Sequence, residues 1–250
     1  MNPTLAAALE ARKALEDTLR EWFPADAFVK AGSLGPWPMF PEEAVLVERA
    51  VERRRLEFAT GRHLTRLGLR HWGLEEAPIG TGKLREPLWP PGIRGALSHD
   101  GDTCIVVLLR EPREEVYGAL ETPEPEKPKA PGLGVDLMTL PQPPGRMEPL
   151  RSMFLARNDE DAEVHRAFGH ETGADVSASL LLFSLKEAIV KAISADVGAF
   201  LELQDLQVFP EKQGGGKVVY RGRVFRGSLW ARSSGPYLVT AAFLSEALKD

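Results

Sequence analysis

Two charged side chains, Glu187 and Lys191, lie one helical turn apart in the apolar stretch FSLKEAIVKAIS at 183–194. At 100° per residue, Ser184, Glu187, Lys191 and Ser194 share an arc of about 80° on a predicted helix whose other faces are mostly apolar. An ordinary i,i+4 ion pair on a helix surface would explain them and contributes about 0.2–0.5 kcal/mol. Residues elsewhere in the sequence are needed to choose between that ion pair and a site for chemistry.

A lone acid, Asp136, lies in the apolar stretch GVDLM at 134–138, and His99 and Asp100 follow another predicted strand. An unpaired carboxylate in an apolar strand costs roughly several kcal/mol, so Asp136 needs a cation or hydrogen-bond donors. An upstream helical pattern is rich in arginine: Arg53, Arg54, Arg55, Arg62 and Arg66. Because Mg²⁺ takes few protein carboxylates and fills its octahedron with phosphate oxygens and water, this combination indicates binding of Mg²⁺ and a phosphorylated ligand.

Composition removes several classes of protein. The net charge of -5 argues against a broad nucleic-acid-binding surface. Cys104 is the only cysteine, which excludes an intrachain disulfide and fits a reducing cytoplasm. The first residues have the charge spacing of an amphipathic helix rather than of a signal peptide, and the apolar stretch 178–199 carries too many charges for a membrane span. We therefore expect a cytoplasmic protein that binds neither nucleic acid nor membrane.

The elements that must position these residues alternate between helices and short strands. Helices are predicted at 4–21, 42–73, from about 147, and most strongly at 175–199; loops at 31–41 and 77–92; strands at 94–99, 103–109, 133–138, 206–209, 217–221, 224–232 and 237–244. The stretch 121–132 is rich in proline and charge without an apolar period, which is typical of an exposed loop or linker.

The two parts of the sequence resemble one another faintly. Each has a helix, an irregular loop, and two strands joined by a short turn, as in SHDGDTCIVVLL against SSGPYLVTAAFL. Two α+β halves of similar plan place a site at their interface. We expect an N-terminal half at 1–120, the linker at 121–132, and a C-terminal half at 133–250.

Four stretches occur in the order and at the spacing of a known family. They are RRLEFATGRHLTR at 54–66, EPLWPPGIRGALSHDGD at 86–102, GVDLM at 134–138 and FSLKEAIVKA at 183–192. From about 50 to 244 the sequence resembles the 4'-phosphopantetheinyl transferases of the larger, surfactin-synthetase-activating type. The three later motifs are specific as a set, although each alone is weak.

The resemblance implies Mg²⁺-dependent transfer of the 4'-phosphopantetheine arm of coenzyme A to a serine of an apo acyl or peptidyl carrier protein, with release of adenosine 3',5'-bisphosphate. Such carriers serve polyketide, nonribosomal peptide or fatty acid biosynthesis. The resemblance also implies an α+β fold of two pseudosymmetric halves, each a helix packed on a small, mostly antiparallel sheet, in a monomer with coenzyme A between the halves.

The family's site residues carry over as expectations. The resemblance implies that Asp136 and Glu187 hold Mg²⁺, that Glu187, directly or through a metal-bound water, takes the serine proton, and that Lys191 steadies the diphosphate. It also implies a set of residues that bind coenzyme A, with His99 on the 3'-phosphate: Arg54, Arg62, Lys83, Arg85, Ser98, His99 and Lys191. The register is uncertain for Lys83 and Arg85, and some arginines of the helix must be solvated or structural. Lys186 points off the polar strip and is expected to be structural or solvent-facing.

One position departs from the family pattern. Many members have a second acid two residues after the aspartate, where this sequence has Met138. Either water replaces that third carboxylate or Asp100 supplies it. The stretch 147–164 lies where the family docks its carrier, with Met153 and Phe154 as apolar anchors; Phe154 is equally compatible with a core position.

Two other functions remain open. The chain could be a catalytically degenerate protein that keeps a coenzyme A cleft and regulates, although Asp136, Glu187 and Lys191 argue against that. It could also be an unrelated Mg²⁺-dependent nucleotide enzyme with accidental motif matches. A mass shift of an apo carrier protein incubated with coenzyme A and Mg²⁺ separates these alternatives.

Overall fold

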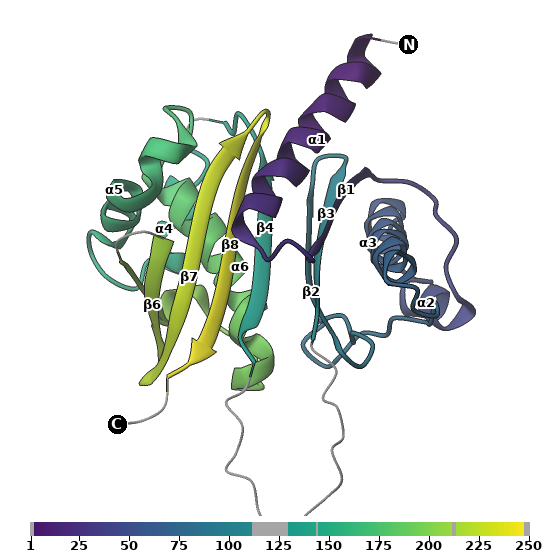
Figure 1. Ribbon diagram of the computed structural model, residues 1–250. Helices are drawn as coiled ribbons and strands as arrows, with labels where there is room; N and C mark the ends of the chain where they lie inside the picture. Colours follow the sequence, from purple (N-terminus) through teal and green to yellow (C-terminus); the bar gives the residue numbers. More distant parts are fainter. Residues whose placement is uncertain (1–2, 112–129, 144, 212–213, 248–250) are drawn as a thin grey trace, which may run out of the picture.

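A computed structural model describes residues 3–111, 130–143, 145–211 and 214–247 of the chain. The predicted linker at 121–132 lies almost wholly outside the described residues. The first part contains one long helix, then a three-stranded antiparallel sheet of order β1-β3-β2 with two further helices (Figure 1). Its elements are α1 (Pro3–Trp22), β1 (Phe28–Ser33), α2 (Pro41–Leu46), α3 (Glu52–His71), β2 (Ile93–Asp100) and β3 (Thr103–Arg110).

The second part is a five-stranded antiparallel sheet of order β4-β8-β7-β6-β5, with α5 and α6 packed against it. The elements are β4 (Gly132–Thr139), η1 (Glu148–Leu150), α4 (Arg151–Phe154), α5 (Glu160–Thr172), α6 (Ala178–Val197), η2 (Leu203–Asp205), β5 (Leu206–Pro210), β6 (Gly215–Tyr220), β7 (Arg223–Ser234) and β8 (Tyr237–Glu246). No helix among the described residues has the length and apolar content needed to span a membrane.

Both parts share one connectivity. The first runs β1, α3, β2, β3 with β3 central, and the second runs β4, α6, β7, β8 with β8 between β4 and β7. Each closing hairpin turns at a glycine with positive φ, Gly101 (57°) and Gly235 (57°). The predicted α+β fold of helices on antiparallel sheets is therefore confirmed, and β5 and β6 extend the second sheet.

Helix α6 is defined by its sequence at both ends. The Ser177 hydroxyl accepts a hydrogen bond from the Leu180 backbone N–H at 3.2 Å, and Gly198 closes the helix in the left-handed conformation. Its apolar residues form the largest core cluster together with the inner face of the second sheet. The predicted helix at 175–199 is confirmed, and so is the one at 4–21, which is α1.

Strand β4 packs unusually close to α6. A Cβ atom added at Gly134 would lie 1.8 Å from the Ala188 carbonyl oxygen, and one at Gly132 would lie 1.8 Å from that of Ala192. Only glycine permits this approach of backbone to backbone. Because side chains alternate along a strand, Asp136 shares the face of β4 that meets α6.

The edge strands β2 and β4 lie beside one another where the two sheets meet (Figure 1). Side chains of β2 bind the backbone of β4: the Ser98 Oγ accepts from Leu137 N–H at 3.2 Å, and Asp100 Oδ2 accepts from Thr139 N–H at 2.6 Å. Helix α1 packs across both sheets, since Leu15 and Leu19 share one buried cluster with β1, β3, β4 and β8.

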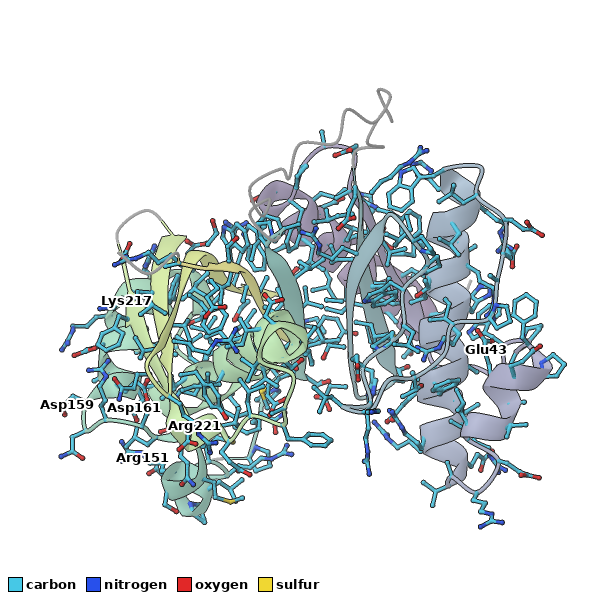
Figure 2. The ribbon with its side chains drawn as sticks, turned by 90° about the horizontal axis from the view of Figure 1, so that it is seen from below. Glu43, Arg151, Asp159, Asp161, Lys217 and Arg221 are labelled. Atoms are coloured by element: carbon cyan, nitrogen blue, oxygen red, sulfur yellow. The ribbon has the colours of Figure 1, made fainter. Side chains whose placement is uncertain are left out.

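Two sequence predictions were wrong in this part of the chain. The single helix predicted at 42–73 is broken between α2 and α3, which lets the fully buried Glu43 on α2 bind Arg66 on α3 at 2.8 Å. Figure 2 shows Glu43 beside α3, at the end of the molecule opposite Arg151. Strand β1 was missed, because the loop predicted at 31–41 overlaps its second half.

Candidate active site

A cleft of about 780 Å³ lies between the two sheets, within the size range of small-molecule sites. Its walls come from β2, from β4, from the C-terminal half of α6, and from the loop at 84–89. The cleft unites six of the residues expected in the site: Arg54, Arg85, Ser98, His99, Asp136 and Lys191. Lys83, Arg62 and Glu187 are not among the residues that line it.

Asp136 meets the partners that its position in an apolar strand requires. One carboxylate oxygen accepts hydrogen bonds from Ser98 Oγ at 3.0 Å and Lys191 Nζ at 2.9 Å. The other accepts from Ser184 Oγ at 2.8 Å. Three elements, β2, β4 and α6, thus converge on one carboxylate that is 8% exposed.

Lys191 joins the two sheets. Its ammonium also donates to Ser98 Oγ at 3.0 Å and to the Val135 carbonyl at 2.9 Å. The Ser98 hydroxyl uses its one proton for Asp136 and accepts from Lys191 and Leu137, so its hydrogen-bonding capacity is filled. The ammonium therefore has a fixed position, with 30% of its side chain exposed at the cleft.

Glu187 lies one turn before Lys191 on the same polar strip of α6. Burial raises the pKa of its carboxyl group, the negative charge of Asp136 raises that pKa further, and Lys191 lowers it. Two carboxylates that repel one another next to a cleft are a donor set that suits a hard divalent cation. That Asp136 and Glu187 hold one metal ion together stays a prediction.

No third acid completes this pair among the described residues, where no group of three or more His, Cys, Asp or Glu side chains could hold a metal ion. Asp100 directs one oxygen at the Thr139 N–H, and Met138 packs into the core cluster of the second half. The Thr139 contact thus occupies one of the two carboxylate oxygens of Asp100.

The opposite wall of the cleft is cationic. His99 Nε2 lies 3.2 Å from Arg54 Nη1, and His99 Nδ1 lies 3.5 Å from a carboxylate oxygen of Glu57. Burial lowers the pKa of His99; Glu57 opposes this shift, and Arg54, Lys191 and Arg53 reinforce it. The exposed Arg54 guanidinium is suited to receive an anion at this wall.

The loop at 81–87 presents Arg85 to the cleft in a left-handed conformation, with φ of 67°. Glu86 holds the loop by accepting from Leu84 N–H at 2.9 Å, and a Cβ at Gly82 would lie 2.0 Å from its carboxylate. A non-glycine residue with positive φ is strained, and such strain gathers at functional sites.

Arg62 has another task. Its guanidinium is buried, stacks on the Phe58 ring at 4.2 Å, and donates to the carbonyls of Ile79 and Gly80 at 2.9 and 3.0 Å. Burial lowers the pKa of Arg62 to about 10. It fastens the chain that leads into the 81–87 loop, and the structure does not bring it to the cleft.

Sequence reasoning missed two contributors, Glu57 and Thr240, and it placed Ser184 on the polar strip without assigning it a partner. Glu57 was visible only as the glutamate of the EFATGR stretch, and Thr240 carried no signal. Thr240 Oγ1 donates to the Ser184 carbonyl at 2.9 Å and thereby supports the serine that binds Asp136. The structure also settles Lys186 as structural, because it is fully buried in an ion pair with Glu160 at 2.8 Å.

The segment proposed to dock a carrier is only partly exposed. Met153 is 64% exposed, whereas Phe154 is fully buried, so of the two alternatives for Phe154 the core position is confirmed. Arg151 pairs with Asp161 at 2.7 Å, and both are labelled in Figure 2. Arg157 pairs with Glu163 at 2.7 Å.

Comparison with known families matches both parts of the chain. A family model described as "4'-phosphopantetheinyl transferase N-terminal domain" matches residues 42–109, and one described as "4'-phosphopantetheinyl transferase superfamily" matches residues 132–242. Together the two matches cover more than half of the chain. The first match contains residues of one wall of the cleft, and the second contains residues of the other wall.

Curated relatives agree with these matches. The chain is 28% identical over 177 residues to 4'-phosphopantetheinyl transferase Svp of Streptomyces mobaraensis, covering 71% of this chain and 63% of the relative. It is 30% identical over 165 residues to Enterobactin synthase component D of Escherichia coli, covering 63% and 64%. It is 49% identical over 59 residues to 4'-phosphopantetheinyl transferase PptT of Mycobacterium tuberculosis, covering 24% and 26%. The chain thus spans less than two thirds of the length of these relatives.

Proposed function

Because the chain belongs to the 4'-phosphopantetheinyl transferase superfamily, we propose that it transfers the 4'-phosphopantetheine arm of coenzyme A to a serine of an apo acyl or peptidyl carrier protein. The serine oxygen attacks the β-phosphorus, the bond from that phosphorus to the bridging oxygen breaks, and adenosine 3',5'-bisphosphate leaves. The proposed carriers belong to polyketide, nonribosomal peptide or fatty acid biosynthesis.

One observation carries the proposal: a single cleft has cations on the wall made by the first half and a carboxylate–lysine cluster on the other wall. Arg54 and His99 suit the 3'-phosphate, and Arg85, which the loop at 81–87 presents to the cleft, suits the diphosphate. Lys191 suits the diphosphate, because its ammonium is already held at the cleft by Asp136 and Ser98.

Asp136 and Glu187 fit a magnesium ion, since the negative charge of Asp136 raises the pKa of the Glu187 carboxyl group and a cation between them would relieve that repulsion. Mg²⁺ held there would neutralise the diphosphate charge that grows as the leaving group departs. With only two protein carboxylates, we expect weak metal affinity in the absence of coenzyme A and strong synergy with it.

Glu187 is the proposed acceptor of the serine proton. Its carboxyl group has a raised pKa, which favours a base that works near neutral pH. Lys191 holds Asp136 while the proton moves, and Ser98 keeps both groups in register across the β2–β4 junction.

The finer assignments rest on the same reasoning. Two halves at 1–120 and 133–250 in one chain, with the site between them, support the larger, surfactin-synthetase-activating type acting as a monomer. The net charge of -5 and the single buried cysteine support a cytoplasmic enzyme that binds neither nucleic acid nor membrane.

The test is a mass measurement on apo carriers. Carriers from peptide, polyketide and fatty acid synthesis are incubated separately with the protein, coenzyme A and Mg²⁺. We expect the mass of at least one carrier to increase by one phosphopantetheine group. Chelation of the metal should prevent this addition. Binding of coenzyme A without modification of any carrier would instead select the regulatory, catalytically degenerate alternative.

A further inference from the structure

A carboxylate lies inside the cationic wall of the cleft. Glu57 on α3 is 11% exposed at its side chain and lies 3.1 Å from Arg53 Nε, 3.4 Å from Arg54 Nη1 and 3.5 Å from His99 Nδ1. An acid there works against anion binding by simple charge, because it cancels part of the positive potential. Its place between the arginines and the imidazole therefore calls for another reason.

The contacts of His99 determine where its proton resides. Arg54 can only donate, so the 3.2 Å contact from Arg54 Nη1 requires a lone pair on His99 Nε2. A neutral imidazole then carries its proton on Nδ1, which is the nitrogen that faces Glu57. Glu57 thus orients the ring, in the way that a carboxylate fixes the tautomer of a histidine that it faces.

An arriving phosphate changes this assignment. A phosphate dianion only accepts hydrogen bonds, so to bind it His99 Nε2 must carry a proton as well. The proton comes from solvent, the ring becomes an imidazolium, and the Nδ1–H remains directed at Glu57, whose negative charge stabilises the new cation. The other charged groups that act on the ring, Arg54, Arg53 and Lys191, all oppose this protonation.

We propose that Glu57 is a positioning residue that couples recognition of the 3'-phosphate of coenzyme A to uptake of one proton by His99. The inference rests on the proposed function, because it takes coenzyme A as the ligand of the cleft. It adds a second criterion by which the site selects coenzyme A: the 3'-phosphate is recognised through the protonation of His99 as well as through its charge.

The pH dependence follows by linkage. Burial keeps the pKa of free His99 below its ordinary value, and a bound phosphate raises it. Between these two values binding takes up a proton, so affinity falls by up to about tenfold for each unit of rising pH. Below the free value His99 is already protonated, and the dependence disappears.

The experiment is calorimetric titration of the full chain with coenzyme A and with 3'-dephospho-coenzyme A near pH 7.5, in buffers of different ionisation enthalpy. The slope against buffer enthalpy counts the protons bound. We expect about one proton for coenzyme A and none for the dephospho form. Glu57→Gln should reduce the uptake and weaken coenzyme A at least tenfold, while affinity for the dephospho form changes less than threefold.

Two further variants complete the design. His99→Gln should abolish the uptake, and it corrects for any titration of the phosphate itself. Glu52→Gln removes an exposed carboxylate from the same helix and should behave as wild type. Unchanged affinity of Glu57→Gln for the dephospho ligand shows that the variant is folded.

Four results would overturn the inference. Tighter binding of coenzyme A by Glu57→Gln would show that the acid only cancels charge. Equal proton uptake by wild type and His99→Gln would remove the histidine from the linkage. Failure of the wild type to bind coenzyme A would contradict both the inference and the proposed function. If the wild type bound coenzyme A and modified a carrier but took up no proton on binding, only the inference would be contradicted.

Discussion

The two halves of the molecule have one connectivity but supply opposite chemistry to the cleft between them. The first half provides cations from α3, β2 and the 81–87 loop, and the second provides carboxylates from β4 and α6. Lys191 breaks the division by crossing to Ser98 on β2 at 3.0 Å, and Glu86 and Glu111 break it from the other side, because both line the cleft from the first half. A repeated fold thus gives two walls that carry different charges, and the proposed function assigns one wall to coenzyme A and the other to Mg²⁺.

The two halves are alike in a structural feature that lies away from the cleft. Each buries one ion pair completely or nearly so: Glu43–Arg66 at 2.8 Å in the first and Glu160–Lys186 at 2.8 Å in the second. Each carboxylate also accepts two backbone N–H groups, from Phe40 and Ile79 or from Ala156 and Val208. The buried pair therefore fixes the loops that cover each helix, and this task does not depend on which chemistry the half performs.

The largest expected effect separates the two walls. Glu187→Gln should lower kcat about a hundredfold or more with little change in affinity for coenzyme A, because it removes the proposed base and a metal ligand. Arg54→Gln should do the reverse, weakening coenzyme A about tenfold with a smaller change in kcat. Single-turnover kinetics and calorimetry measure both. If each variant altered the two quantities equally, the division of labour between the halves would not hold.

The second prediction tests the shared device. Lys186→Met and Arg66→Met should each lower the free energy of unfolding by about 3–5 kcal/mol, because each leaves a buried carboxylate uncompensated. Adding Glu160→Gln to Lys186→Met should restore at least half of the lost free energy of unfolding. Urea unfolding measures these values. Lys13→Met, at an exposed pair, is the control and should leave the midpoint unchanged.

A smaller effect is expected at the 81–87 loop. Gly82→Ala places a methyl group against the Glu86 carboxylate, so it should displace Arg85 and raise the KM for coenzyme A about three- to tenfold, roughly 1 kcal/mol. In the double variant with Glu86→Ala, the alanine at 82 should add nothing to the effect of Glu86→Ala alone. Additive effects would show that the Glu86 contact does not hold the loop.

The smallest prediction concerns the support of Asp136. Ser184→Ala removes one donor to its carboxylate and should cost about 1 kcal/mol of transition-state stabilisation, seen as a few-fold lower kcat/KM and a higher Mg²⁺ requirement. Ser179→Ala is the matched control, because its hydroxyl binds Asp161, away from the cleft, at 3.0 Å. An identical response of both variants would assign Ser184 to stability alone.

Periodicity predicted the strongest elements because their burial is local. Helix α6 has apolar residues on most faces and a cap at each end, and the hairpins of β2–β3 and β7–β8 have glycine turns. Strand β1 was not predicted because only Val29 and Ala31 of its six residues are buried. Its strand conformation depends on pairing with β3, which is distant in the sequence. The break between α2 and α3 was not predicted because the position of Glu43 depends on its ion pair with Arg66, which is distant in the sequence.

The site divides in a similar way. Asp136 could be found from sequence, since a lone acid in an apolar strand demands partners, and those partners are Ser98, Ser184 and Lys191. The arginines could not be sorted, because helical spacing does not tell which guanidinium meets a backbone carbonyl and which meets the cleft. Arg62 and Arg54 differ in that respect alone.

Helix α1 ties together residues that are made at very different times. Its Thr18 hydroxyl donates to Ser234 Oγ at 3.2 Å, its Glu21 pairs with Arg232 at 2.5 Å, and its Trp22 ring stacks on Trp230. On the ribosome this helix emerges before both sheets, and β7 follows it by some two hundred positions. Its apolar face can find its full set of neighbours only when synthesis has passed β7, so completion of the fold waits for the second sheet.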